Sequence, residues 1–334
     1  MAVLQLYFAS LRLIFLMDTE ATKKSTYTGI ALALITTIIW SGNFIIARDL
    51  YERIPPVSLA FYRWALASVI IFFLGYKKFI AEKNIVFKNW RYFFWVALMG
   101  ITLFNTFIYV AGHTTSATNM ALIGTTAAPI FAIIISAIFL KEAITPLRIT
   151  GLLFCIAGVI VLLSKGSMRT LFAFRFTSGD VWILLAAFVF SIYTVLVKRK
   201  PSAISPATFL FVVFIGGTLL LLPFFIIEAI VTPPVIWDSK LFACILYLGI
   251  GASVIAFFCW NAAIARIGAV RTALFGNLIP VFSTLEAVWL LGETITTVHI
   301  VSGALVIIGL VLANLKNAQG KQGRILIGSR INVV

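Results

Sequence analysis

The chain has little charge and few of the residues on which soluble catalysts depend. Charged residues make up 11% of its 334 positions, whereas about 25% is usual in soluble domains. It contains only two histidines, and no HExxH, GxSxG or phosphate-binding loop sequence. Catalysis therefore has little support, no metal ion or cofactor is expected, and ATP hydrolysis is not expected to drive any transport.

Cysteine is scarce as well. Cys155, Cys244 and Cys259 are odd in number, and each lies inside an apolar stretch instead of a loop. Buried packing residues are expected at such positions, not disulfides or a metal site.

Apolar residues dominate what remains. They make up 62% of the chain, and the mean hydropathy is +1.09. Stretches of about 18 or more apolar residues, the span of a bilayer core, recur along the length, whereas the short alternating segments of an outer-membrane barrel are missing. The pattern predicts an all-α integral membrane protein with ten helices, at 28–47, 57–75, 93–112, 119–140, 146–164, 181–197, 206–227, 241–264, 271–291 and 297–315.

The net charge of +15 is distributed over the ends of the predicted helices. Most basic residues fall in segments on the same side of the membrane as the N-terminus. The opposite side carries only Arg48, Arg53, Lys165, Arg169, Arg175 and Lys240. The positive-inside rule then predicts that both termini are cytoplasmic. Because the basic residues form no single patch, nucleic acid is not expected as a partner.

The two halves of the chain match each other. Pro129 and Pro280, and Gly158 and Gly309, lie 151 residues apart, and Phe61 and Phe211 lie 150 apart. Each half holds five predicted helices, so the second half enters the membrane with the opposite polarity. We therefore expect an inverted repeat, the organisation of membrane transporters whose site lies between the repeats.

The repeats set the expected boundaries. Repeat 1 covers 28–164 and repeat 2 covers 181–315, with a linker at 165–180 and a basic cytoplasmic tail at 316–334. The N-terminal segment 1–27 begins with an apolar stretch that is too short to span a bilayer and lacks the features of a signal peptide. Either this stretch is an interfacial helix, or translation starts at Met17.

Several short motifs occur in a fixed order. They are Trp40-Ser41-Gly42-Asn43-Phe44 in the first helix, Pro55-Pro56 and Phe61-Tyr62-Arg63-Trp64 in the second, Pro129 followed by Leu140-Lys141-Glu142 in the fourth, and Pro280 followed by Leu291-Gly292-Glu293-Thr294 in the ninth. Together with the duplication, they resemble the EamA family of the drug/metabolite transporter (DMT) superfamily over about residues 28–315. Lys141 stands where that family usually has Gly.

The resemblance implies a secondary transporter that works by alternating access through a central cavity between the halves. Most members of this family are exporters of amino acids and related small metabolites in the bacterial inner membrane. The resemblance does not imply one solute.

Polar and aromatic residues recur at helical spacing inside the predicted spans. Their spacing places them on shared faces within helices 1, 3, 8 and 9. Equivalent positions of the two halves often carry side chains of the same kind. The candidates for the cavity lining are Trp40, Asn43, Thr102, Asn105, Tyr109, His113, Tyr193, Ser253, Trp260, Asn261 and Asn277. These faces either line the cavity and bind a solute, or join helices through interhelical hydrogen bonds.

Three ionisable side chains within the spans have two readings each. Arg63 either attracts a solute carboxylate or fixes a loop or headgroup. Glu286, the most membrane-buried acid, either couples transport to protons or packs against a donor. His113 either titrates near neutral pH or is an ordinary polar group at a helix end.

Two further features concern the shape of the bundle. Pro129 and Pro280 each remove a backbone hydrogen bond and form either a gate or a fixed bend. Small residues two turns apart, Gly151 and Gly158 in helix 5 and Ser302 and Gly309 in helix 10, predict close packing. That packing joins either the two halves or two protomers, and the oligomeric state is left open.

The sequence thus predicts a membrane-embedded exporter of amino acids or similar small metabolites. It works either by exchange with protons or by facilitated diffusion. The alternative within the same superfamily is an organic-phosphate or nucleotide-sugar antiporter, or a drug exporter. Phosphate-bearing solutes call for several cavity cations, and Arg63 is the one candidate. The expected partners are the solute, the lipid bilayer and, for an exchanger, protons.

Overall fold

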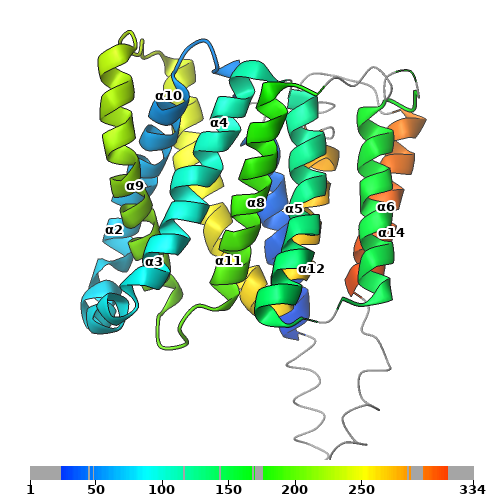
Figure 1. Ribbon diagram of the computed structural model, residues 1–334, viewed down its shortest axis with the longest axis horizontal. Coiled ribbons are helices and arrows are strands. Elements are labelled where there is room, and N and C mark those ends of the chain that lie inside the picture. The colour runs from blue at the N-terminus through cyan, green and yellow to red at the C-terminus, as the bar shows by residue number, and fades with distance from the viewer. Residues whose placement is uncertain are drawn as a thin grey trace, which may run out of the picture.

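The computed structural model is an all-helical bundle (Figure 1). It describes residues 24–43, 46–47, 49–115, 117–142, 144–167, 169, 176–283, 286 and 296–314. The predictions for segment 1–27 ahead of Lys24, for a start at Met17 and for the basic tail at 316–334 lie outside these residues.

Eight of the described helices are long and apolar enough to cross a membrane, and two shorter apolar helices, Ala269–Ser283 and Thr297–Ala313, complete the predicted ten. The first runs over Lys24–Asn43. The others are built from α2 (Pro56–Lys88), α3 (Trp90–Ala97), η1 (Leu98–Leu103), α4 (Phe104–Thr114), α5 (Ala117–Leu140), α6 (Pro146–Leu163), α8 (Ser178–Lys198), α9 (Pro206–Val231), α10 (Ser239–Leu246), η2 (Tyr247–Ile255), α11 (Ala256–Ile267), α12 (Ala269–Leu274), η3 (Phe275–Leu278) and α14 (Thr297–Asn314).

The helix ends differ from the predicted ones where hydropathy alone set them. The first helix begins earlier than predicted, and α2 continues past residue 75 to Lys88. Hydropathy falls at Lys77, but neither glycine nor proline interrupts residues 76–88, so the backbone remains helical. Helices 3 and 8, which are repeat partners, both contain a π-helical stretch, η1 and η2. Such stretches are rare and often lie at functional sites.

Helices α2 and α9 lie antiparallel and occupy equivalent places in the two halves. Ser68 and Thr218, which are repeat partners, share a hydrogen bond of 2.9 Å between their hydroxyls. Equivalent residues meet in this way only near the axis that relates the halves. The pairing therefore shows the inverted repeat directly, and the predicted fold class is confirmed.

A glutamate from each of these two helices caps the start of the other. Glu228 of α9 accepts hydrogen bonds from the backbone N–H groups of Val57 (3.1 Å) and Ser58 (2.6 Å) at the start of α2. At the other end, Glu82 of α2 accepts from the N–H of Ser205 (2.8 Å), just before α9. A carboxylate at a helix N-terminus satisfies free N–H groups and opposes the helix dipole.

Replacing Glu228 with Gln should destabilise the protein by about 1–2 kcal/mol, because the neutral amide loses the charge-assisted cap. The thermal unfolding midpoint of the purified protein measures this effect. Glu52→Gln is the matched control, since Glu52 is exposed and caps no helix. Equal midpoints for the two variants would show that the cap contributes nothing.

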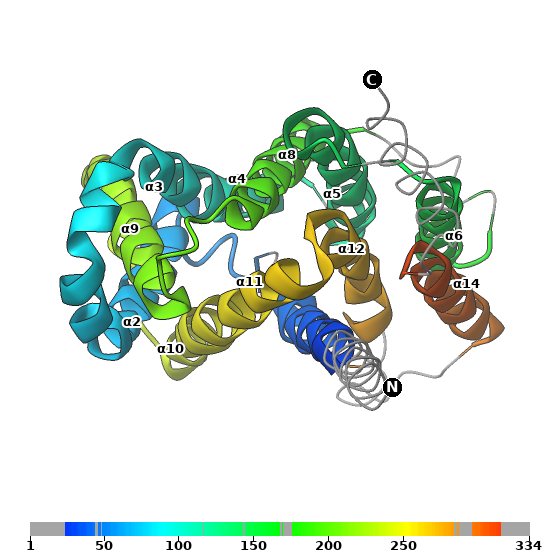
Figure 2. The ribbon, with the colours of Figure 1, turned by 90° about the horizontal axis from the view of Figure 1, so that it is seen from below.

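Helices α6 and α14 also join the two halves, as do α5 with α8 and α4 with α8, and the α6–α14 pair lies at one end of the bundle (Figure 2). Ser302 donates to the carbonyl of Gly158 (2.8 Å). A Cβ placed on Gly151 would lie 2.5 Å from the carbonyl oxygen of Gly309, and the reverse distance is also 2.5 Å. The small residues of helices 5 and 10 therefore join the two halves of one chain.

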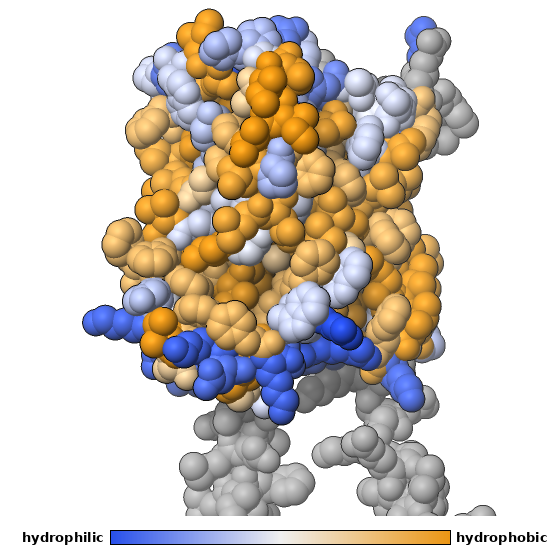
Figure 3. Space-filling model, turned by 60° about the vertical axis from the view of Figure 1, so that its left-hand side comes forward, coloured by the Kyte–Doolittle hydropathy of each residue, from blue (hydrophilic) through white to orange (hydrophobic). Residues whose placement is uncertain are grey.

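The surface carries the pattern expected of a membrane protein (Figure 3). Hydrophobic side chains cover the middle of the bundle, and a hydrophilic band follows its lower rim. In the described residues, exposed apolar side chains such as Phe73, Phe224 and Ile230 face outward. The chain is therefore a multi-pass membrane protein. Inside the lipid-facing surface, a second set of side chains is buried between the helices.

Candidate functional site

A small cavity with aromatic walls lies between the halves. Trp40 from the first helix, Phe104 from α4, Phe190 from α8 and Trp260 from α11 all line it. Its volume is about 60 Å³, well below the roughly 300–1,000 Å³ of typical ligand pockets. The helices are therefore closed around it in this conformation.

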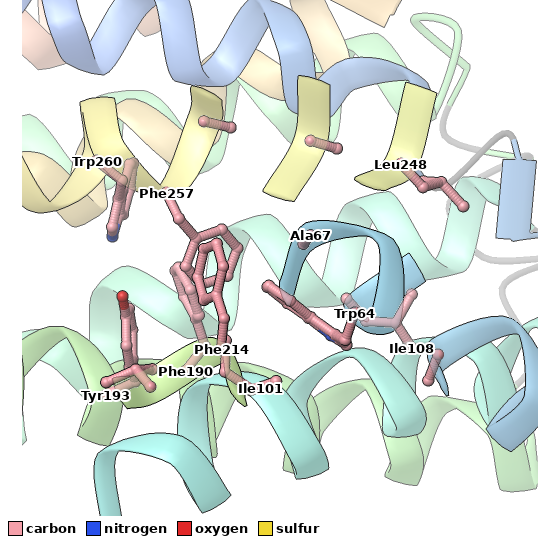
Figure 4. Close-up of a cluster of buried hydrophobic side chains, with 14 of the residues drawn as sticks. Trp64, Ala67, Ile101, Ile108, Phe190, Tyr193, Phe214, Leu248, Phe257 and Trp260 are labelled. Carbon is pink, nitrogen blue, oxygen red and sulfur yellow. The ribbon is translucent and has the colours of Figure 1, made fainter. Parts of the chain in front are cut away.

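The aromatic side chains contact one another directly. The ring centroids of Trp40 lie 4.9 Å from those of Trp260 and 5.5 Å from those of Phe190, its repeat partner. Figure 4 shows Phe257 between Trp64 on one side and Trp260 and Tyr193 on the other. The Trp40 indole N–H donates to the carbonyl of Ala252 (2.9 Å), which fixes the orientation of the ring.

Hydroxyl groups supply the polar part of the cavity wall. Thr125 donates to the carbonyl of Ala121 (2.6 Å), and Thr194 donates to that of Phe190 (2.9 Å). Ser191 also lines the cavity and has carbonyl acceptors on α5 and α8. Each hydroxyl oxygen retains lone pairs that can accept a further hydrogen bond.

The indole nitrogen of Trp260 is buried without a hydrogen-bond partner in the described structure. Trp260 is 1% exposed and lines the cavity. An unpaired buried donor has a free-energy cost of about 1–3 kcal/mol. An acceptor on a bound solute would remove that cost.

Arg63 is the centre of a separate, fully buried polar cluster. Its guanidinium donates to Ser253 Oγ (2.7 Å), Asn43 Oδ1 (2.9 Å), Asn105 Oδ1 (2.7 Å) and Tyr109 OH (2.9 Å). It also donates to the carbonyl of Ala252 (2.9 Å), the same oxygen that accepts from Trp40.

The Arg63 cluster contains no counter-charge. Among the described residues, no carboxylate oxygen lies within 4 Å of the guanidinium, and the side chain is 1% exposed. Neutral oxygens and the face of Trp64, whose ring centroid lies 5.1 Å from Arg63 Cζ, stabilise the charge instead. Four of the predicted cavity residues, Asn43, Asn105, Tyr109 and Ser253, thus surround Arg63 and do not line the cavity.

Four more of the predicted cavity residues form hydrogen bonds elsewhere in the bundle. Thr102 donates to the carbonyl of Gly217 on α9 (3.1 Å). Tyr193 donates to Asn261 Oδ1 (2.8 Å). Asn277 donates to the carbonyl of Leu274 (3.0 Å), and its own oxygen is buried without a partner.

The two prolines and Glu286 lie along helices 4 and 9. Pro129 lies inside α5, and Pro280 follows the 3-10 helical turn η3. Glu286 accepts a hydrogen bond from the hydroxyl of Ser41 in the first helix (2.5 Å). Glu293, which the repeat pairs with Glu142, lies outside the described residues.

His113 lies outside the cavity, at the exposed end of α4. It borders a second hollow of about 610 Å³, together with Arg53, Glu228 and the loop 232–236, and its ring meets that of Tyr51 edge-on. Near the hollow, the N–H of Leu241 and the side chain of Arg53 hold the pKa of Asp238 below its ordinary value.

Sequence reasoning did not single out Thr125, Thr194 or Gly276, which all line the cavity. Thr125 and Thr194 lie in strongly apolar helices, where a single hydroxyl carries little signal. For Ser191 the sequence did offer one indication, because this residue is the repeat partner of Ser41 in the first-helix motif.

Two inverted halves of five helices around an internal cavity define a membrane transporter. The chain belongs to the EamA-like transporter family, whose profile matches residues 27–164 and 177–315. It is 29% identical over 289 residues to an uncharacterized transporter of Archaeoglobus fulgidus, covering 86% of this chain and 98% of the relative.

A second relative, a probable amino-acid metabolite efflux pump of Salmonella typhimurium, is 24% identical over 292 residues, covering 84% of this chain and 92% of the relative. A solved crystal structure has the same fold, with a TM-score of 0.67 and 20% identity over 87% of this chain and 96% of the other.

Proposed function

We propose that this transporter exports amino acids or related small metabolites across the cell membrane by alternating access. The observation that carries the proposal is the aromatic-walled cavity between the halves. The Salmonella relative, named as a probable amino-acid metabolite efflux pump, supports the same solute class.

The cavity surface is almost entirely apolar in this conformation, so polar groups of its lining residues would reach a solute only as the helices move apart. The Trp260 N–H can donate to a carboxylate, and the hydroxyl oxygens of Thr125, Ser191 and Thr194 can accept from an ammonium group. The faces of Trp40 and Phe190 attract a cation and cover an apolar side chain. At about 60 Å³ the cavity has to widen before a solute enters, as alternating access requires.

The proposal has three structural parts that extend the sequence predictions. The repeats at 28–164 and 181–315, joined by the linker 165–180, rock against each other around the contacts of α2 with α9 and of α6 with α14. Pro129 and Pro280 serve as hinges or fixed bends in this motion. Both termini are cytoplasmic, because the basic residues concentrate at the helix ends on that side.

Proton exchange is the energy source that we propose for uphill export. Glu286 is the acid in the described part of the membrane region that contacts the first helix, through Ser41. Because this hydrogen bond joins helices 1 and 9, movement of either helix would change the surroundings of the carboxylate.

Gly276→Val should abolish efflux while leaving the fold intact. Gly276 lines the cavity, and a Cβ at this position meets no atom within 4 Å, so the added methyl groups fill the cavity without displacing backbone. Cells loaded with amino acids through dipeptide feeding would lose them faster with the parent chain than without it, and the variant should reduce that gain at least tenfold.

The matched control is Gly303→Val, because the nearest atom to a Cβ there is 4.0 Å away and the residue lies outside the cavity lining. Normal efflux with Gly303→Val and none with Gly276→Val would support the cavity as the solute path. Unchanged efflux in both would contradict it. No amino-acid efflux from the parent, despite confirmed membrane expression, would redirect the proposal to other metabolites or cationic drugs.

A further inference from the structure

The last third of α2 lies across the end of the bundle. At 1.5 Å per residue, its 33 residues measure about 50 Å, whereas the hydrocarbon core of a bilayer is about 30 Å thick. In Figure 1 the end of α2 is seen almost end-on at the lower left, and in Figure 2, viewed from below, it runs lengthwise toward α3. This segment, residues 76–91, consists of the end of α2, Asn89 and the first two residues of α3; it lies along the rim of the bundle and is called the rim helix below.

One side of the rim helix holds it against the protein. Phe79 stacks on Phe211 of α9, with ring centroids 4.7 Å apart. Glu82 accepts from the backbone of Ser205, and Val86 is buried. These positions follow helical spacing, so the rotation of the rim helix about its own axis is fixed.

A second side is apolar and exposed. Tyr76, Ile80 and Phe87 are 45%, 43% and 65% exposed. Their spacing of four and seven residues places them on one face, which continues the exposed Phe73 one turn earlier. Trp90, 58% exposed, follows at the end of the segment. Tyrosine and tryptophan are the residues that proteins favour at the boundary between lipid tails and headgroups.

Basic side chains surround this apolar face, and one of them, Lys83, lies on the face between Ile80 and Phe87. They are Lys77, Lys78, Lys83, Lys88 and Arg91, all exposed. None of them forms an ion pair with a described acid. The segment has a single acid, Glu82, which the cap of α9 already occupies. The exposed charge of the rim helix is therefore positive only, and it coincides with the hydrophilic band at the lower rim in Figure 3.

We propose that the rim helix is an interfacial helix that binds the headgroups of anionic phospholipids in the leaflet on its side. Its apolar face continues the lipid-facing surface of α2, so it enters the outer part of the acyl layer. Its lysines then lie at the depth of the phosphate groups, where each gains from a negatively charged surface. A protein partner would have to displace lipid from both the apolar face and the basic side chains of the rim helix.

Native mass spectrometry of the purified full-length chain tests this proposal. The chain is released from nanodiscs of equal phosphatidylglycerol and phosphatidylcholine, and the retained lipids are counted. The parent should retain the anionic lipid preferentially. The variant with Lys77, Lys78, Lys83 and Lys88 all changed to Gln should lose about tenfold of that preference.

The control carries the same number of neutralised cations on the same rim, outside the rim helix. It changes Lys24, Lys141, Lys198 and Arg266 to Gln, all of which are exposed. The control should keep the preference of the parent, and 0.5 M salt during reconstitution should weaken the preference of the parent without any substitution.

Equal losses in the test variant and its control, or no preference in the parent, would overturn the proposal. So would capture of a soluble protein by the parent that excludes the anionic lipid. If the fourfold variant is not recovered folded, the two double variants Lys77→Gln with Lys78→Gln and Lys83→Gln with Lys88→Gln should each lose part of the preference. None of these outcomes depends on which solute is exported.

Discussion

Replacing Arg63 with Lys should destabilise the protein by about 3–6 kcal/mol, although the charge is kept. The guanidinium donates to five oxygens, whereas an ammonium group has only three hydrogens to donate. At least two of the five hydrogen bonds are then lost, and a buried hydrogen bond to a charged group contributes about 1.5–3 kcal/mol. Arginine and lysine are not interchangeable where a planar group is held from several sides.

The thermal unfolding midpoint in detergent and the recovery of monodisperse protein would measure this effect. Arg53→Lys is the matched control, because Arg53 forms an exposed ion pair with Asp238, and such pairs contribute about 0–1 kcal/mol. An Arg63→Lys midpoint equal to that of the parent would show that the cluster does not stabilise the fold.

The second large effect is expected from Gly309→Ala. The added methyl carbon would lie 2.5 Å from the carbonyl oxygen of Gly151 and 2.8 Å from the backbone nitrogen of Cys155. Because both are backbone atoms, α6 and α14 must move apart, and such overpacking costs about 1–3 kcal/mol. The lost contact is one of several that join the halves, so the unfolding midpoint should fall and efflux should fall with it.

Gly216→Ala in α9 is the control for that substitution. A Cβ there has Ala97 Cβ at 3.5 Å, an ordinary contact. Alanine also favours the helix by up to about 1 kcal/mol relative to glycine, so this variant should be as stable as the parent or slightly more so. Equal behaviour of Gly309→Ala and Gly216→Ala would mean that close approach of α6 and α14 is not needed.

The Arg63 cluster shows how far sequence spacing reaches. Spacing predicted that Asn105 and Tyr109 share a face, and their common contact with Arg63 agrees with it. It did not predict that Asn43 and Ser253, from two other helices, meet the same guanidinium. Spacing fixes positions around one helix axis, whereas the rotation of each helix against its neighbours depends on packing.

The repeat shows a second limit. Equivalence between the halves predicted equivalent helices, and Ser68 with Thr218 and Trp40 with Phe190 meet as repeat partners. Arg63 has no such match, because its partner position is Val213. One half thus holds a buried charge and the other an apolar side chain, so the two halves are not interchangeable around the cavity.

The sequence by itself determined the membrane class, the ten apolar helices, the inverted repeat and the family, because bilayer thickness and helical periodicity act on each segment separately. Only the tertiary structure decided that the small residues of α6 and α14 join the halves, that Trp40 and Trp260 form a cavity wall, and that the end of α2 turns along the rim. Each of these depends on which faces of separate helices meet, and that follows from the close packing of all the side chains together.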